Sequence, residues 1–401
     1  MFTNRQLFLK HLGQTSHTPL MVEIVKAEGV YMYGPSGEKY LDLISGVSVS
    51  NTGHRHPKVI AAIKEQIDSY LHLMVYGEMI LSPQVKYAEL LASLLPAGMD
   101  SCYFVNSGSE AIEGALKLAK KFTGRSRIIS FTNSYHGNTH GALSIQGSEL
   151  YKNSFRPLLP DVFQIDFNDN EAINLIDDHT ACVIAEPVQA EAGIIFPVND
   201  YLLKIRKRCD ETGTLLIFDE VQTGFGRLGR MFAIDRFNLV PDILVLAKAL
   251  GGGMPLGAFI SSHKVMSVLA DKPALGHITT FGGHPVCCAA GLASLKVIIE
   301  ENLADECRRK SELIKKNLNH PAILNVRGEG LFLAVVLADK EKVDYAVTHA
   351  PEFGLILDFF LFCKDALRIA PPLTIKDDEI IVACEQFNKL LDDVMKNTGP
   401  K

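Results

Sequence analysis

Five short apolar runs recur in the first 250 residues, and polar stretches with helical periodicity separate them. Nearly every position in these runs is apolar, so they lack the alternation of a strand with one wet face. Such runs are typical of strands buried on both faces of a parallel sheet. They lie at residues 102–105, 127–131, 181–185, 214–218 and 243–246. The pattern predicts an α/β fold built on a mostly parallel sheet.

The pattern changes after about residue 290. A long helical stretch over 290–317 precedes short strands near 331–337 and 366–369, and a closing helix near 377–395. A chain of 401 residues exceeds what one simple core usually serves. We therefore predict an N-terminal segment (1–50) that packs with the small domain, a large cofactor-binding domain (51–290) and a small α+β C-terminal domain (291–401).

Composition excludes several classes of function. The formal net charge is -6, and the basic residues are scattered, which argues against binding to nucleic acid or to a membrane surface. The eight cysteines show no CxxC spacing, and the chain has no apolar run long enough to span a bilayer. These features predict a cytoplasmic protein.

The turn after the first run carries Ser107, Gly108 and Ser109 and leads into a helix marked by Ile112 and Leu116. Backbone N–H groups at a helix start bind phosphate well, and glycine permits close approach. Many ordinary turns have the same composition, so this signal is weak alone.

Two further runs end in groups that can react. Asp219 ends one run, where ligands of open α/β sheets bind, and its carboxylate could meet a cationic ring nitrogen; it could equally cap the next turn. Lys248 ends another run and is followed by three glycines, Gly251–Gly253, after Ala249 and Leu250. A buried lysine is rare, and desolvation lowers its pKa and makes it a nucleophile. A snorkelling lysine is the alternative.

Together these features supply a phosphate cradle, a partner for a ring nitrogen and an imine-forming lysine, the set that pyridoxal phosphate (PLP) chemistry needs. Over nearly its full length the chain resembles the class III (omega-type) aminotransferases, which are fold type I PLP enzymes with a seven-stranded, mostly parallel sheet. The stretches that carry the resemblance appear in the family's order. They are Gly53-His54-Arg55-His56-Pro57, Asn106-Ser107-Gly108-Ser109-Glu110-Ala111, Tyr135-His136-Gly137, Glu186-Pro187-Val188-Gln189, Asp219-Glu220-Val221-Gln222-Thr223-Gly224, Ala247-Lys248, Thr280-Phe281-Gly282-Gly283 and Arg368-Ile369-Ala370-Pro371-Pro372-Leu373.

The resemblance implies a role for each cofactor contact. Lys248 would hold PLP as a Schiff base and shuttle the substrate proton, and Asp219 would pair with the ring nitrogen. Gly108 and Ser109 would bind the phosphate, Tyr135 and Val221 would cover the two ring faces, and Gln222 would bond the ring hydroxyl. Ser107, His136 and Glu186 complete the cofactor contacts. Thr280 would reach the phosphate of a neighbouring subunit, which implies a homodimer with shared active sites.

The resemblance also implies a substrate site. Arg368 would grip a substrate carboxylate, and Glu191 would neutralise that arginine when no carboxylate is present. A surface salt bridge is the alternative for Arg368. His54, His56 and His136 lie in turns that are structural in the family, so we predict no metal site.

Two substrate positions depart from the family pattern. Asn138 stands where family members that act on ornithine, acetylornithine or 4-aminobutyrate usually have arginine, and Val47 aligns with a tyrosine of ornithine enzymes. Losing a guanidinium removes a charge-assisted bond of roughly 1.5–3 kcal/mol. Ornithine or 4-aminobutyrate specificity is therefore in doubt.

The sequence predicts a PLP-dependent aminotransferase that moves an amino group from an amino acid or omega-amino donor to 2-oxoglutarate or pyruvate by a ping-pong mechanism. An aminomutase or lyase on the same scaffold is the nearest alternative. A catalytically silent PLP-binding protein is the alternative from another class, and the intact Lys248, Asp219, Gln222 and Arg368 argue against it.

Overall fold

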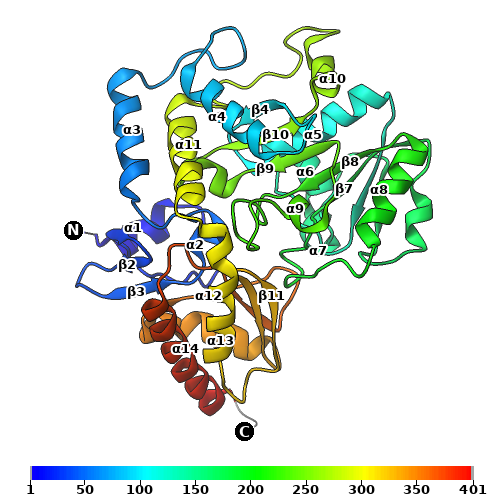
Figure 1. The fold of residues 1–401 in the computed structure, drawn as a ribbon. Coiled ribbons are helices and arrows are strands. Elements are labelled where there is room, and N and C mark those ends of the chain that lie inside the picture. Colours follow the sequence, from blue (N-terminus) through cyan, green and yellow to red (C-terminus); the bar gives the residue numbers. More distant parts are fainter. Residues whose placement is uncertain (1, 399–401) are drawn as a thin grey trace.

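A seven-stranded sheet forms the centre of the larger part of the molecule in the computed structural model, which describes residues 2–398 (Figure 1). Only β10 runs antiparallel to its two neighbours, and the other adjoining pairs are parallel. The predicted α/β class and mostly parallel sheet are confirmed. In spatial order the strands are β4 (Ser101–Val105), β10 (Gly257–Ser261), β9 (Ile243–Leu246), β8 (Leu215–Asp219), β7 (Thr180–Ala185), β5 (Arg127–Phe131) and β6 (Val162–Ile165).

Two of these strands, β6 and β10, are missing from the five apolar runs. β6 is an edge strand whose side chains are mostly half-buried or exposed, so it lacks a continuous apolar run. β10 begins at Gly257, where a Cβ atom would come within 2.2 Å of the Ser107 carbonyl oxygen. Only glycine, which has no Cβ, fits where β10 passes this close to another backbone. The glycine at its start makes β10 less recognisable as an apolar run.

Both faces of the sheet are covered, which explains the unbroken apolar runs. Alternate residues of β7, such as Cys182 and Ile184, pack with α5 on one face, while Val183 and Ala185 join a second core with α8. The helices of this part are α3 (Pro57–Ser69), α4 (Ser82–Leu94), α5 (Gly108–Thr123), α6 (His140–Ser144), α7 (Glu149–Lys152), α8 (Tyr201–Thr212), α9 (Ala233–Phe237) and α10 (His263–Met266).

The single helical stretch expected over 290–317 is wrong. The chain forms α11 (Pro285–Glu300) and α12 (Leu303–Asn317), and it breaks at Asn302, whose φ of 51° is left-handed. Asparagine tolerates this conformation better than most residues. Apolar periodicity continues on both sides of the break, so it does not reveal where one helix ends. Figure 1 shows α11 beside α3 and α12 in the C-terminal part.

A four-stranded antiparallel sheet organises the C-terminal part, in the order β11 (Asn325–Glu329), β12 (Phe332–Val336), β15 (Ala366–Ile369) and β14 (Asp358–Phe359). Leu333, Val335 and Leu367 share the main core with buried residues of α14 (Asp377–Asn397). Ala334 and Ala366, on the other face, pack with Val188 and Ala190 of the large part. α13 (Lys340–His349) completes this part.

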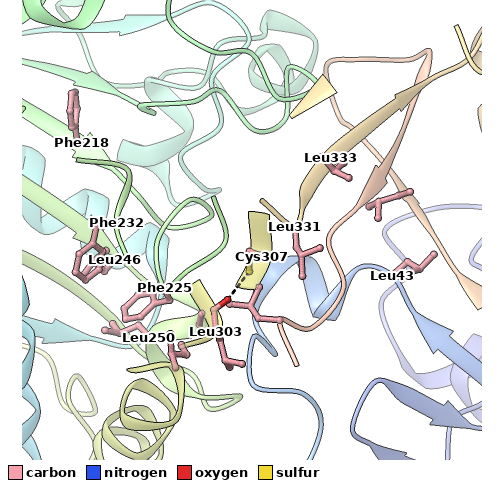
Figure 2. Close-up of a cluster of buried hydrophobic side chains, with 14 of the residues drawn as sticks. Leu43, Phe218, Phe225, Phe232, Leu246, Leu250, Leu303, Cys307, Leu331 and Leu333 are labelled. Carbon is pink, nitrogen blue, oxygen red and sulfur yellow. Dashed lines mark hydrogen bonds between the residues drawn. The ribbon is translucent and has the colours of Figure 1, made fainter. Parts of the chain in front are cut away.

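The N-terminal residues contact the C-terminal part. β3 (Lys39–Asp42) pairs in parallel with β13 (Leu355–Ile356), and β2 (Tyr31–Tyr33) and β1 (Lys26–Glu28) extend that sheet. α1 (Asn4–His11) precedes them. Figure 2 shows Leu43 of this segment in one hydrophobic cluster with Phe218 of the large part and Leu333 of the small sheet. The division at residues 50 and 290 stays a prediction.

The turn that follows, α2 (Ser45–Ser48), has the opposite hand to a normal helix. Ser45, Gly46, Val47 and Ser48 all have φ between 45° and 64°. Each non-glycine residue in this conformation costs about 1–2 kcal/mol. The segment therefore needs strong external contacts to hold it.

Arg227 supplies such contacts. Its side chain is fully buried, and its guanidinium donates hydrogen bonds to Ser45 Oγ (3.0 Å) and Asn51 Oδ1 (2.5 Å) of the N-terminal region. The same group donates to the carbonyl oxygens of Leu331 (2.9 Å) and Pro371 (2.6 Å) in the C-terminal part. One side chain thus links three regions of the chain.

We predict that Arg227→Ala lowers the free energy of unfolding by roughly 3–5 kcal/mol, because it leaves several buried acceptors without a donor. Urea denaturation followed by circular dichroism measures this change. Arg230→Ala is the matched control, since Arg230 is exposed and three residues away, and it should stay within about 0.5 kcal/mol of the unmodified protein. Equal midpoints for the two variants would show that the Arg227 contacts contribute little.

No helix among residues 2–398 has both the length and the apolar character needed to cross a bilayer.

Candidate active site

A cavity of about 390 Å³ lies where strands of the large sheet end. Ligands of α/β sheets bind outside the carboxyl ends of parallel strands, and β4, β7, β8 and β9 all contribute lining residues just beyond or at their ends. Every cofactor contact expected from the sequence lines this cavity except Thr280. Those that do are Ser107, Gly108, Ser109, Tyr135, His136, Glu186, Asp219, Val221, Gln222 and Lys248.

The start of α5 forms one wall. Ser107 caps the helix, because its Oγ accepts a hydrogen bond from the Glu110 N–H at 3.2 Å. Gly108 follows in the narrow space beside Val221, whose Cγ1 would lie 3.3 Å from an added Cβ. The first N–H groups of a 16-residue helix have no partner within the helix and attract anions. This wall has the chemistry to hold a phosphate.

Asp219 ends β8 as a buried carboxylate. Its Oδ2 lies 2.8 Å from His136 Nδ1, and its Oδ1 accepts from the Val221 N–H at 3.0 Å. The carboxylate is the acceptor, so His136 Nδ1 carries the hydrogen in this pair. Asp219 is thereby fixed in orientation and presents a negative charge to the cavity.

Glu186 connects two segments of the wall. Its Oε1 accepts from the Tyr135 N–H and its Oε2 from the Ala190 N–H, both at 2.9 Å. Burial raises the pKa of Glu186 to about 7, against the opposing effect of His136. Because Ala190 precedes Glu191, this one carboxyl group helps to set the positions of both Tyr135 and Glu191.

Lys248 follows β9 in a strained conformation, with a φ of 52°. It lines the cavity and is otherwise enclosed by protein, and this burial lowers the pKa of its amine to about 8, although the nearby Glu191 opposes the shift. An amine with this pKa is partly neutral near pH 7 and can act as a nucleophile.

Arg368, on β15, is almost completely buried and reaches across to the large part. Its Nη2 donates to both carboxylate oxygens of Glu191, each at 2.7 Å, and the Gln222 amide donates to Glu191 Oε1 at 2.9 Å. Burial alone would raise the pKa of Glu191, but Arg368 and Gln222 outweigh it and hold that pKa below its ordinary value. Arg368 is therefore not in a surface salt bridge.

Five expected site residues lie outside the cavity lining, and two of them are Arg368 and Glu191, described above. Thr280 is exposed on the loop before α11, Asn138 is exposed although its N–H donates to Ser109 Oγ at 3.2 Å, and Val47 is half-buried in the left-handed turn. His54 contacts Asp42 at 2.8 Å, and His56 lies 3.5 Å from Glu301. These two histidines and His136, which contacts Asp219, thus have three different acidic neighbours.

The sequence reasoning missed several lining residues. Val49 closely follows the left-handed turn, and Met254, Pro255 and Leu256 come directly after the glycine run 251–253. Their place in the sequence could have identified them, because residues that follow a glycine run close to Lys248 are expected to lie near the same cavity. The others are Asn106, Gly137, Thr223, Ala247 and Gly253.

Comparison with known proteins decides the family. The sequence pattern of the class III aminotransferases matches residues 12–391. The chain belongs to the class III aminotransferase family. An acetylornithine aminotransferase from Methanopyrus kandleri is 38% identical over 394 residues, which cover 97% of each chain.

Solved structures agree with this assignment. The ornithine aminotransferase from Toxoplasma gondii, described with partial occupancy of PLP at its active site, superposes with a TM-score of 0.90 at 31% identity and covers 99% of this chain and 96% of its own. An omega transaminase from Pseudomonas jessenii, in complex with PMP, gives a TM-score of 0.92 at 27% identity over 100% of both chains.

This aminotransferase uses PLP, as its family does. The cavity fits that cofactor, because the capped start of α5 suits a phosphate, the buried Asp219 suits a cationic ring nitrogen and the Lys248 amine suits an aldehyde. Bound PLP supplies an aldehyde that bonds to amines and a ring that accepts electrons from the substrate carbon.

We predict a pH-dependent stability in the cofactor-free protein. The ordinary pKa of lysine is 10.5 and that of folded Lys248 is about 8, so the unfolded chain binds more protons between these values. Below pH 8 the buried amine destabilises the fold by roughly 3 kcal/mol, and this penalty disappears as pH rises to 10.5.

The measurement compares the free energy of unfolding of the cofactor-free protein with that of Lys248→Met across this pH range. The difference should favour Lys248→Met below pH 8 and shrink toward pH 10.5. A difference that does not change with pH would mean that the amine titrates normally in the fold.

Proposed function

We propose that Lys248 is the lysine that holds PLP and that Asp219 pairs with its ring nitrogen. The observation that carries this proposal is the convergence of a buried amine, a buried carboxylate and a helix start on one cavity. Asp219 would keep the ring nitrogen protonated, and His136 would orient Asp219 through their 2.8 Å contact. Lys248, once displaced by a substrate amine, would move a proton between the substrate Cα and the cofactor C4′.

The remaining wall residues would position the ring. Gly108 and Ser109 would bind the phosphate through backbone N–H groups at the start of α5, and Ser107 would hold that helix start in place. Tyr135 and Val221 would pack on opposite ring faces. Gln222 bonds Glu191 in the structure and would also reach the ring hydroxyl.

The Arg368–Glu191 pair supports a switch between two substrates. With Glu191 bonded to it, Arg368 is neutralised and the site suits a donor without a carboxylate. A keto acid would displace Glu191 and form the bidentate pair that arginine favours with carboxylates. The acceptor would be 2-oxoglutarate or pyruvate, and the two half-reactions would alternate in a ping-pong cycle.

The amino donor is less constrained. The relative from Methanopyrus kandleri is named for acetylornithine and a 36% identical relative from Staphylococcus aureus for ornithine. Asn138 lacks the guanidinium and Val47 lacks the phenol hydroxyl that the family pattern places beside the carboxylate of such a donor. We therefore propose an amino acid or omega-amino donor that needs no arginine at position 138.

A half-reaction screen tests the proposed function. Single amino donors are added to the purified protein while the visible absorbance of lysine-bound PLP is followed. We expect one donor to bleach it and 2-oxoglutarate or pyruvate to restore it. Lys248→Ala should abolish both the absorbance and turnover. If PLP binds and no donor bleaches it, the aminomutase, lyase or silent-binder alternatives replace the aminotransferase.

We also propose a homodimer in which Thr280 completes the partner's phosphate site. Thr280 is exposed and lies next to Thr279, whose Oγ1 accepts from the Asn106 amide at 3.2 Å. Exposed apolar side chains occur on the loop that carries Thr280 and on the loop before α4. The two loops are in contact, because the centroids of the His72 and Phe281 rings lie 4.9 Å apart. Such a patch is typical of a protein interface. Its members are Leu71, Leu73, Met74, Met79, Ile80, Leu275, Ile278 and Phe281.

Mixed dimers test this arrangement. Thr280→Asp should weaken PLP binding, because a carboxylate there repels the phosphate. Subunits with Lys248→Ala and subunits with Thr280→Asp are each inactive alone, but mixing and reassociation should restore one of the two sites in each mixed dimer. No recovery of activity, in a sample that light scattering shows to contain dimers, would mean that Thr280 does not act across the interface.

The eight cysteines are all free, which supports a reducing compartment such as the cytoplasm.

A further inference from the structure

Asp358 is an acidic residue that no step above uses. It lies on β14, the two-residue edge strand of the small sheet, directly opposite Arg368 on β15. Side chains opposite each other in an antiparallel pair point to the same face of the sheet. Asp358 therefore faces the same way as the arginine of the substrate site.

That face of the sheet is turned toward the large part of the molecule. Ala366 and Ala370, two residues before and after Arg368, share its face and pack in one cluster with Val188 and Ala190. The segment 188–191 of the large part also carries Glu191, which Arg368 bonds. The Asp358 side chain is thus directed to the substrate site rather than to the helices behind the sheet.

Two carboxylates, Glu191 and Asp358, lie beside Arg368, and only one of them is paired with it. Glu191 takes both short bonds to Arg368, whereas Asp358 forms no salt bridge among residues 2–398. Its Oδ1 accepts only the Phe359 N–H, at 2.9 Å.

The Asp358 carboxylate interacts with the charged groups of the site. Burial raises the pKa of Asp358, Arg368 opposes that rise, and Glu191 adds to it. The Lys248 amine also acts on the Asp358 carboxylate, so the field of Asp358 extends to the reacting group. A charge that acts on Lys248 across a poorly solvated site also acts on any substrate bound between Asp358 and Lys248.

We propose that Asp358 is a specificity-determining residue that disfavours a carboxylate on the carbon bearing the reacting amine, so that the preferred donor carries its amine at the end of a chain. This rests on the proposed function, in which Arg368 binds substrate carboxylates. A carboxylate that replaces Glu191 at Arg368 still faces Asp358 and is repelled by it. A terminal amine leaves Glu191 in place and meets no such repulsion.

The test compares two donors that differ only in that carboxylate, norvaline and butylamine, with the PLP-loaded protein. Asp358→Asn keeps the Oδ1 that accepts the Phe359 N–H and removes the charge. We expect kcat/KM for norvaline to rise roughly tenfold relative to that for butylamine, and KM for pyruvate to fall. Asp358→Glu restores the charge and should restore the selectivity of the unmodified protein.

Glu385→Gln is the matched control, because it removes one negative charge from an exposed position of the same part of the chain. An equal change for both donors in Asp358→Asn, or the same shift in Glu385→Gln, would overturn the assignment of Asp358 while leaving the proposed function intact. If no donor changes the absorbance of the unmodified protein, the proposed function itself fails and this inference fails with it.

Discussion

Six of the seven strands of the large sheet run in the same direction, and the position of the active site follows from this. Parallel strands all end at one edge, so residues scattered from 106 to 248 along the chain arrive there together. Glu186 follows β7, Asp219 ends β8 and Lys248 follows β9. The antiparallel strand β10 begins at the same edge, which explains why residues 253–256, just before it, also line the cavity.

Collecting charged groups at one buried edge is costly, and the structure offsets the cost by pairing them. Asp219 has His136 and a backbone N–H, Glu186 has two backbone N–H groups, and Glu191 has Arg368 and Gln222. Lys248 and Asp358 have no salt-bridge partner among the described residues, and burial lowers the pKa of the Lys248 amine. The lysine that we propose to bond PLP is thus left without a partner that would hold it in its charged form.

The parts that the sequence predicts well are those where local pattern and environment agree. Strands buried on both faces leave an unbroken apolar run, and Lys248 and Asp219 stand out because charged residues rarely end such runs. The resemblance to a family adds the expected cofactor contacts, and all of them except Thr280 line one cavity in the structure.

What the sequence does not reveal depends on tertiary contacts. The break at Asn302 interrupts a continuous apolar period, β6 is half-exposed, and β10 begins with a glycine fixed by the Ser107 backbone. Asp358 lies opposite Arg368 only because of the register of β14, a strand of two residues. No pattern within the segment itself encodes that register.

The left-handed turn at Ser45–Ser48 restricts how the cavity wall beside it can move. A turn of this hand cannot drift into a right-handed one by small adjustments, because the φ values between them are sterically forbidden. Asp42, whose Oδ1 accepts the Ser45 N–H, and Arg227 hold the turn at one end, and Val49 lines the cavity just beyond the other. Small backbone shifts therefore cannot widen the cavity at Val49 through this turn, because the turn would first have to change hand.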